Sequence, residues 1–268
     1  PLACSLAAAG FAVLTIDLRG HGPSSRARLT YGACERHDVL GAVDWLRARG
    51  HGRVGVLGAS MGASTALLAA ADEPAIAALV ADSAFADFAE MIERQFRRLS
   101  RLPSCFLPGA LAVGRLLTGV DLRGVRPLAS AAALVGRPVL VIHSEGDRFV
   151  PVADAQAIAK ATGADLWTTA TQRHIGSYGG GPEAYTERVL AFFVQHLGQP
   201  AAASAVVLSD RCPVHPRRES PDERGQILFN QRFARRSPAP QPQRQQHHHR
   251  HDRRDHRVGL AEARGAAT

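Results

Sequence analysis

A serine flanked by glycines is the side chain of this sequence best suited to nucleophilic chemistry. The segment 58–62, Gly-Ala-Ser-Met-Gly, follows an apolar, strand-like run at 53–57 and precedes a helix-like run at 63–71. A serine at a sharp strand-to-helix turn exposes its hydroxyl, and glycines two residues to either side relieve the crowding. The following helix points its free backbone N–H groups at the same spot. The pattern predicts that Ser60 is a nucleophile poised to attack a carbonyl.

Such a serine needs a base within reach and a carboxylate that orients the base. In a parallel α/β sheet these groups belong in the loops that follow the carboxyl ends of strands. Asp147 suits the acid, because it follows the strand-like run 139–143. Glu145 is its rival, but Gly146 suits a tight turn that presents the next residue. A helix cap or a plain surface turn is the alternative role for Asp147.

His174 is the histidine whose position suits the base. It lies in a loop shortly after the strand-like run 165–169. The other histidines before residue 199 lie in a turn, beside helices or at a strand: His21, His37, His51, His143 and His196. The chain order Ser60, Asp147, His174 also matches a known order of nucleophile, acid and base. We therefore expect these three residues to form a catalytic triad.

Alternating strands and helices must position these residues. Strands are expected at 11–17, 54–57, 76–81, 139–143 and 165–169. Helices are expected at 35–49, 63–71, 152–161 and 183–197. Such alternation with short connections predicts an α/β fold, in which helices cover both faces of a mostly parallel sheet. The segment 84–137 interrupts the rhythm, and we expect a small helical cap there that shapes the substrate site. A helical insertion that only packs is the alternative.

Four segments together resemble the α/β-hydrolase superfamily, over roughly residues 2–197. The run 17–24, Asp-Leu-Arg-Gly-His-Gly-Pro-Ser, is similar to the D-x-R-G-x-G-x-S turn after the fourth strand of these enzymes. The run 58–62 resembles their nucleophile elbow, and 147–151 resembles their D-x-x-V-P acid loop. The run 81–85, Ala-Asp-Ser-Ala-Phe, is similar to the serine-aminopeptidase-like and general esterase branch.

This resemblance implies a serine hydrolase of the carboxylic-ester type, which forms an acyl-enzyme and needs no cofactor. It implies that Gly58 and Gly62 are the elbow glycines and that the backbone N–H of Met61 binds the oxyanion. A peptidase or a thioesterase of the same fold would use the same residues. The implied partner is a small-molecule ester or acyl substrate.

One departure from the family pattern limits this expectation. The family has three strands before the D-x-R-G-x-G strand, and a His-Gly motif after the third supplies half of the oxyanion hole. No His-Gly motif precedes Asp17 in this sequence. We therefore expect an N-terminally truncated chain that lacks the first strands and the oxyanion loop. A catalytically inert fragment or binding protein that keeps the triad residues is the alternative function.

Most of the net positive charge of the chain comes from its last seventy residues. Residues 1–198 hold 19 Lys and Arg against 17 Asp and Glu, whereas residues 199–268 hold 13 against 7. The second segment is rich in Arg, Pro, Gln and His, so we expect a disordered tail at 199–268 behind a core at 1–198. The near-neutral core gives no reason to expect a nucleic-acid partner. Weak RNA or membrane contact by the tail arginines, and metal binding by its histidines, are alternatives.

The remaining classes of function find no support. The four cysteines form no C-x-x-C pair, so neither a zinc site nor a redox motif is supported, and no metal site is expected. No uninterrupted apolar run reaches the roughly 18 residues of a membrane span. No signal peptide is visible, which favours a cytoplasmic location. The sequence predicts no particular oligomeric state.

Overall fold

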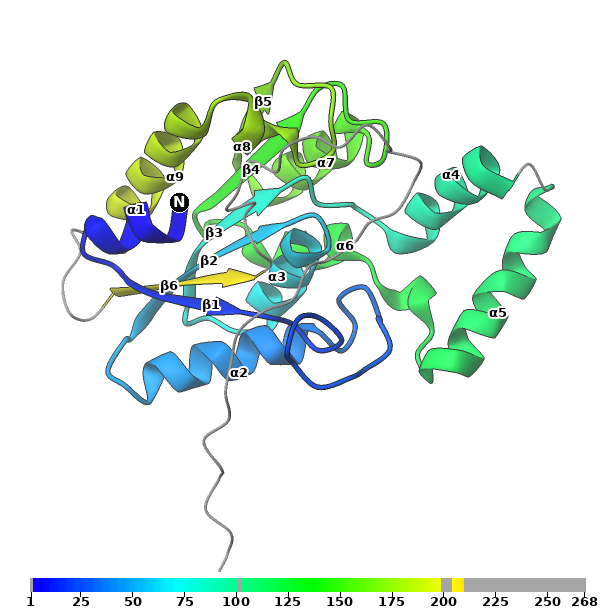
Figure 1. Ribbon diagram of the computed structural model, residues 1–268, viewed down its shortest axis with the longest axis horizontal. Helices are drawn as coiled ribbons and strands as arrows, with labels where there is room; N and C mark the ends of the chain where they lie inside the picture. Colours follow the sequence, from blue (N-terminus) through cyan, green and yellow to red (C-terminus); the bar gives the residue numbers. More distant parts are fainter. Residues whose placement is uncertain (1, 101–102, 199–203, 210–268) are drawn as a thin grey trace, which may run out of the picture. The chain divides into compact units, whose positions relative to one another are not determined.

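The central element of the fold is a six-stranded parallel sheet with the strand order β1-β6-β2-β3-β4-β5 (Figure 1). The computed structural model describes residues 2–100, 103–198 and 204–209, all within the first of two compact units of the chain, at 1–233. The strands are β1 (Ala12–Ile16), β2 (Arg53–Ala59), β3 (Ile76–Asp82), β4 (Val139–Ser144), β5 (Asp165–Thr169) and β6 (Ser204–Ser209). The predicted strands all occur, within two residues at either end.

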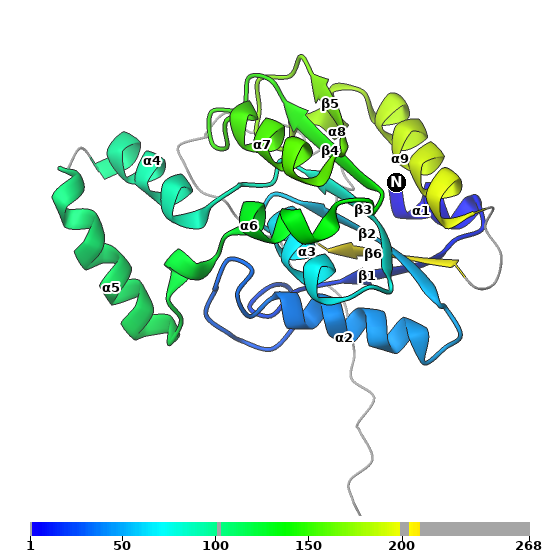
Figure 2. The same ribbon diagram turned by 180° about the vertical axis from the view of Figure 1, so that it is seen from behind.

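Helices cover both faces of this sheet (Figures 1 and 2). The main helices are α1 (Leu2–Ala8), α2 (Arg36–Arg47), α3 (Met61–Asp72), α4 (Phe88–Ser100), α5 (Leu107–Thr118), α6 (Pro127–Ala131), α7 (Val152–Thr162), α8 (Gly176–Gly180) and α9 (Pro182–Leu197). Short 3-10 turns are η1 (Ser104–Phe106), η2 (Leu122–Gly124) and η3 (Ala132–Leu134). Helices α2, α3 and α7 share one buried core with the sheet, and α1 and α9 share another. The predicted α/β class is confirmed.

Successive side chains of a strand point to opposite faces of the sheet, and in β3 the side chains on both faces are apolar. In β3, Leu79 and Ala81 face the core that contains α3, whereas Ala78 and Val80 face the core that contains α9. All four side chains are fully buried. A strand with apolar residues on both faces is stable only between two layers of helices. The near-continuous apolar runs of the sequence thus produce a three-layer arrangement.

Strand β6 corrects the prediction of a wholly disordered tail. It comes from the segment 199–268, yet it lies between β1 and β2 and pairs in parallel with both. Its Ala-Val-Val-Leu run, 205–208, is almost completely buried and contributes to both cores. Averaging composition over seventy residues conceals four apolar residues that suffice for a central strand. The rest of the predicted tail, at 199–203 and 210–268, lies outside the described residues.

The insertion at 84–137 is helical, as expected, but its two ends behave differently. Helix α4 packs with η2 around a small apolar cluster that includes Phe88 and Met91. Helices α4 and α5 extend from the carboxyl end of the sheet (Figures 1 and 2). The last part, with α6 and η3, packs on α3, and Leu134 belongs to the main core. A separate cap can therefore comprise at most the α4–α5 portion.

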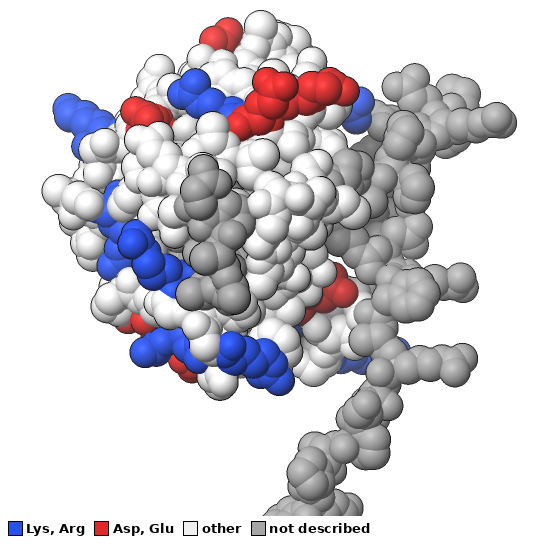
Figure 3. Space-filling view, turned by 90° about the vertical axis from the view of Figure 1, so that its left-hand side faces the viewer, with Lys and Arg blue, Asp and Glu red and all other residues white. Residues whose placement is uncertain are grey.

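The charged residues on one face of the body are mixed in sign. Figure 3 shows this face, on which Lys and Arg side chains (blue) and Asp and Glu side chains (red) both occur amid uncharged surface, some of them side by side. None of the helices in the described part of the chain is both long and apolar enough to cross a membrane.

Candidate active site

The structure brings Ser60, His174 and Asp147 together at the carboxyl end of the sheet. The Ser60 Oγ lies 2.7 Å from the His174 Nε2, and the His174 Nδ1 lies 2.5 Å from the Asp147 Oδ2. Ser60 lies between β2 and α3, Asp147 follows β4, and His174 follows β5. Because parallel strands end at one edge, three residues far apart in sequence meet there. The arrangement can pass a proton from the hydroxyl to the imidazole.

The backbone at Ser60 takes the sharp turn that the glycine pattern predicts. Ser60 has φ 52° and ψ −117°, which is unusual for a residue with a side chain. A Cβ at Gly58 would come within 2.4 Å of the Gly62 backbone, so glycine is required at position 58. The Ser60 N–H donates to the carbonyl oxygen of Asp82 at 2.7 Å, which joins the turn to the neighbouring strand β3. The strained serine is thus held by the packing around it.

Asp147 is held as an acceptor for His174. Its side chain is buried, and its Oδ1 accepts backbone N–H bonds from Phe149 (2.7 Å) and Val150 (3.0 Å). Burial acts to raise the pKa of Asp147, but the hydrogen bond from His174 and those backbone bonds outweigh it and hold the pKa below its usual value. The carboxylate is therefore ionised near neutral pH and fixes the orientation of the imidazole.

The loop that carries His174 is fixed by hydroxyl groups. The Ser144 Oγ accepts the Gly176 N–H at 3.1 Å and the Thr171 hydroxyl at 2.8 Å, which ties both flanks of His174 to β4. The ring of Phe149 lies 5.0 Å from the His174 ring, centroid to centroid. Sequence reasoning missed these supporting residues, because a single serine or threonine after a strand has no distinctive pattern.

The rival residues make other contacts, although the His143 Nε2 lies 3.7 Å from the Asp147 Oδ2. Glu145 is exposed and accepts from the Thr168 hydroxyl at 2.8 Å. His143 is buried within β4, where its Nε2 lies 3.0 Å from the Val150 carbonyl oxygen, and burial lowers its pKa. Of the histidines in the described residues, His174 is the one in hydrogen-bond contact with Ser60.

Met61 begins α3 immediately after Ser60, so its backbone N–H lies at the amino end of a twelve-residue helix. Within the described residues this N–H has no hydrogen-bond acceptor, and it is available for an anion. Strand β6 ends beside the same turn: Ser209 pairs with Gly58, and the Ser209 Oγ lies 3.4 Å from the Gly62 carbonyl oxygen. The strand therefore delivers the chain to the edge where Ser60 lies.

Comparisons with known proteins agree with this fold. The model of a family described as alpha/beta hydrolase fold matches residues 2–106. The uncharacterized protein YqkD of Bacillus subtilis (strain 168) is 34% identical over 190 residues, which cover 68% of this chain and 62% of that protein. The chain thus spans less than two thirds of this relative.

Solved structures of esterases are also similar to this chain. The Pyrococcus furiosus esterase Pf2001 is 26% identical, with a TM-score of 0.60 over 72% of this chain and 74% of that chain. The esterase domain of a Rhodothermus marinus protein, 18% identical, has a TM-score of 0.53 over 74% of this chain and 79% of that chain, and shares the fold. This chain belongs to the alpha/beta-hydrolase superfamily. These similarities support a hydrolase.

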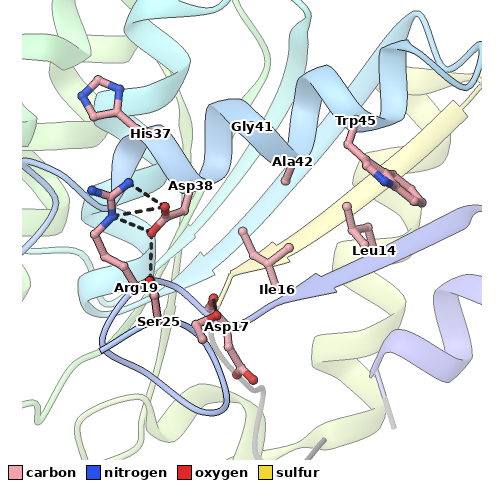
Figure 4. Close-up of a pocket in the computed structure, with 11 residues that line it drawn as sticks. Leu14, Ile16, Asp17, Arg19, Ser25, His37, Asp38, Gly41, Ala42 and Trp45 are labelled. Carbon is pink, nitrogen blue, oxygen red and sulfur yellow. Dashed lines mark hydrogen bonds and ion pairs between the residues drawn. The ribbon is translucent and has the colours of Figure 1, made fainter. Parts of the chain in front are cut away.

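A cavity in the described part of this alpha/beta-hydrolase chain is separate from the Ser60 site. It has a volume of about 470 Å³ and lies along β1 and α2, where Leu14, Ile16 and Trp45 line it (Figure 4). Arg19 and Asp38 also line it, and the Arg19 guanidinium donates to both carboxylate oxygens of Asp38. None of the three residues that meet at Ser60 lines it. Within the described residues, no group of three or more His, Cys, Asp or Glu side chains could hold a metal ion.

Proposed function

We propose that this chain is a serine hydrolase that cleaves an ester or a related acyl bond of a small molecule. The observation that carries the proposal is the 2.7 Å contact between the Ser60 hydroxyl and the His174 imidazole, with Asp147 behind it. Nucleophile, base and orienting acid in this order are what acyl transfer requires. The membership of the chain in the alpha/beta-hydrolase superfamily supports the same reaction class.

In the proposed reaction, His174 removes the proton of the Ser60 hydroxyl as its oxygen attacks the carbonyl carbon. The Met61 N–H donates to the oxyanion that develops, with the amino end of α3 behind it. His174 then protonates the leaving alcohol, and an acyl-Ser60 ester remains. Water, deprotonated by His174, attacks this ester and releases the acid. Asp147 stabilises the imidazolium in both steps.

The α4 portion of the insertion supports a role in shaping the substrate site. The Gln95 side chain donates to the Phe149 carbonyl oxygen at 2.8 Å, and Arg98 donates to the Arg148 carbonyl oxygen at 2.8 Å. Phe149 in turn lies against His174. Helix α4 is therefore attached to the loop that carries the acid. We propose that its surface selects the acyl or leaving group, which decides between esterase, thioesterase and peptidase activity.

The test replaces Ser60 with alanine in the full chain and measures hydrolysis of a short-chain chromogenic ester. Loss of the nucleophile should reduce kcat by roughly 10⁶-fold, as for other enzymes whose serine acts in a triad. A fluorophosphonate probe should label the wild-type chain, with the adduct at Ser60 by mass spectrometry. Ser25→Ala, an exposed serine outside the site, is the matched control and should keep full activity.

The outcomes separate the proposal from its alternatives. Hydrolysis retained by Ser60→Ala would overturn the assignment of the nucleophile. A correctly folded wild-type chain that neither reacts with the probe nor hydrolyses any ester, thioester or peptide substrate would favour the inert binding protein.

A further inference from the structure

A second buried carboxyl group lies next to the proposed active site and has no part in the reaction described above. Asp82 is the last residue of β3, and 1% of its surface is exposed. Its Oδ1 accepts the Ser83 hydroxyl at 2.8 Å, and its Oδ2 accepts the Tyr185 hydroxyl of α9 at 3.0 Å. None of the ion pairs in the described part of the chain includes Asp82. A buried carboxyl with neutral partners only is unusual, because burial favours the uncharged acid.

The backbone at Asp82 is part of the support for the nucleophile. Its carbonyl oxygen accepts the Ser60 N–H, and the next N–H, that of Ser83, donates to the Ile142 carbonyl oxygen of β4 at 2.9 Å. Ser83 has φ 56°, one of the four non-glycine residues with positive φ in the described chain. The side-chain bonds of Asp82 to Ser83 and Tyr185 thus hold a strained peptide that joins the Ser60 turn to β4.

The carboxyl group of Asp82 changes its charge state close to neutral pH. Burial raises its pKa to about 6, although the hydrogen bonds from Ser83 and Tyr185 and the charge of His174 oppose this, while Asp147 adds to it. The charged groups that act on Asp82 are therefore His174 on the loop after β5 and Asp147 on the loop after β4. Tyr185 from α9 faces it as a neutral donor. Above about pH 6 the negative charge is present, and below it the charge is lost.

We propose that Asp82 is a positioning residue, whose carboxylate holds the Ser60 turn through Ser83 and Tyr185 and adds a second negative charge to the field at His174. The inference rests on the proposed function, since it assigns a role within the same site. In the transition state His174 becomes an imidazolium, and a negative charge nearby stabilises it relative to the neutral ring. Activity therefore depends on a titration of Asp82 in addition to the protonation of His174.

The test compares Asp82→Asn and Tyr185→Phe with the wild type, as kcat and KM for the chromogenic ester from pH 5 to pH 9. In the wild type, protonation of Asp82 near pH 6 contributes to the fall of kcat/KM on the acid side, in addition to the protonation of His174. Asp82→Asn keeps the size of the side chain but cannot ionise, so the contribution of Asp82 to this fall should disappear. Its kcat should fall roughly tenfold at pH 8, with KM unchanged, because one charge interaction with the transition state is lost. At pH 5, where the wild-type carboxyl is itself neutral, the two proteins should be alike.

Tyr185→Phe supplies the second, independent variant. It removes one donor that lowers the pKa of Asp82, so the acid-side ionisation should move to higher pH. Asp165→Asn, an exposed carboxyl at the start of β5, is the matched control and should leave the profile unchanged. Circular dichroism establishes that each variant is folded.

The results decide between the inference and the function on which it rests. If Asp82→Asn and Tyr185→Phe both show the wild-type pH profile, the inference is overturned while the Ser60 assignment stands. If Asp82→Asn fails to fold, the shift expected for Tyr185→Phe decides alone. If Ser60→Ala retains activity, the proposed function fails, whatever the Asp82 variants show.

Discussion

The edge of the sheet around Ser60 and the helix α5 differ in how many contacts fix them to the rest of the protein. At the edge, the residues that meet are fixed by backbone and side-chain bonds from β3, β4 and the loop after β5. Along α5, Leu107 is the only buried residue, and Val113, Leu116 and Leu117 are more than half exposed. The chemistry that we propose thus belongs to the firmly held region. The loosely attached region is free to vary without loss of the reaction, as expected for a part that selects substrates.

The largest effect expected at the edge is on the rate of the reaction. Asp147→Asn should lower kcat by about 10⁴-fold, because the amide cannot hold His174 in the tautomer that accepts the Ser60 proton. Glu145→Gln, two residues away and exposed, should change kcat by less than about twofold, which corresponds to a change in activation free energy smaller than RT. Steady-state kinetics with the chromogenic ester measures both. Equal losses in the two variants would show that the acid has been assigned to the wrong carboxylate.

Two glycines test the contrast in stability directly. Gly58→Ala places a Cβ against the Gly62 backbone, so it should lower the free energy of unfolding by about 3 kcal/mol or more and abolish activity. Gly109→Ala lies on α5 with open space around it. It should raise stability by about 0.5–1 kcal/mol, since alanine favours the helix. Urea unfolding followed by circular dichroism gives both values, and effects of the same sign would contradict the contrast.

The smallest effect is expected for an apolar residue of α5. Leu116 is 83% exposed, so Leu116→Gln should change the free energy of unfolding by no more than about 0.5 kcal/mol. If α5 contacts substrate, the same variant should lower kcat/KM for long-chain esters more than for acetyl esters. A panel of p-nitrophenyl esters measures this ratio. A large loss of stability would instead mean that α5 is part of the body.

Much of this fold follows from local patterns. The strands at 76–81 and 139–143 were predictable because uninterrupted apolar runs of that length can be buried only inside a two-sided sheet. The meeting of Ser60, Asp147 and His174 was predictable because all three follow strands. Their catalytic roles, like the cytoplasmic location and the absence of a nucleic-acid partner, stay predictions.

Other features depend on contacts that no local pattern contains. β6 was missed because its four apolar residues lie in a segment of biased composition. Its place is set by pairing with β1, roughly 190 residues earlier, and with β2, roughly 150 residues earlier. Asp82 was noted only within a family-like run. Its significance lies in burial and in the Tyr185 hydroxyl, which comes from a helix about a hundred residues later. The division of the insertion likewise depends on which of its helices meets α3.

The position of β6 has a consequence for the order of folding. In the described sheet β1 pairs with β6 and not with β2, so β1 cannot join the other described strands until residues 204–209 have been synthesised. Until then β1 and β2 each present an open row of N–H and C=O groups to other chains. Closing so long a loop in a parallel sheet is slow. During translation, β1 and β2 are therefore exposed to mispairing on the sides that β6 later occupies.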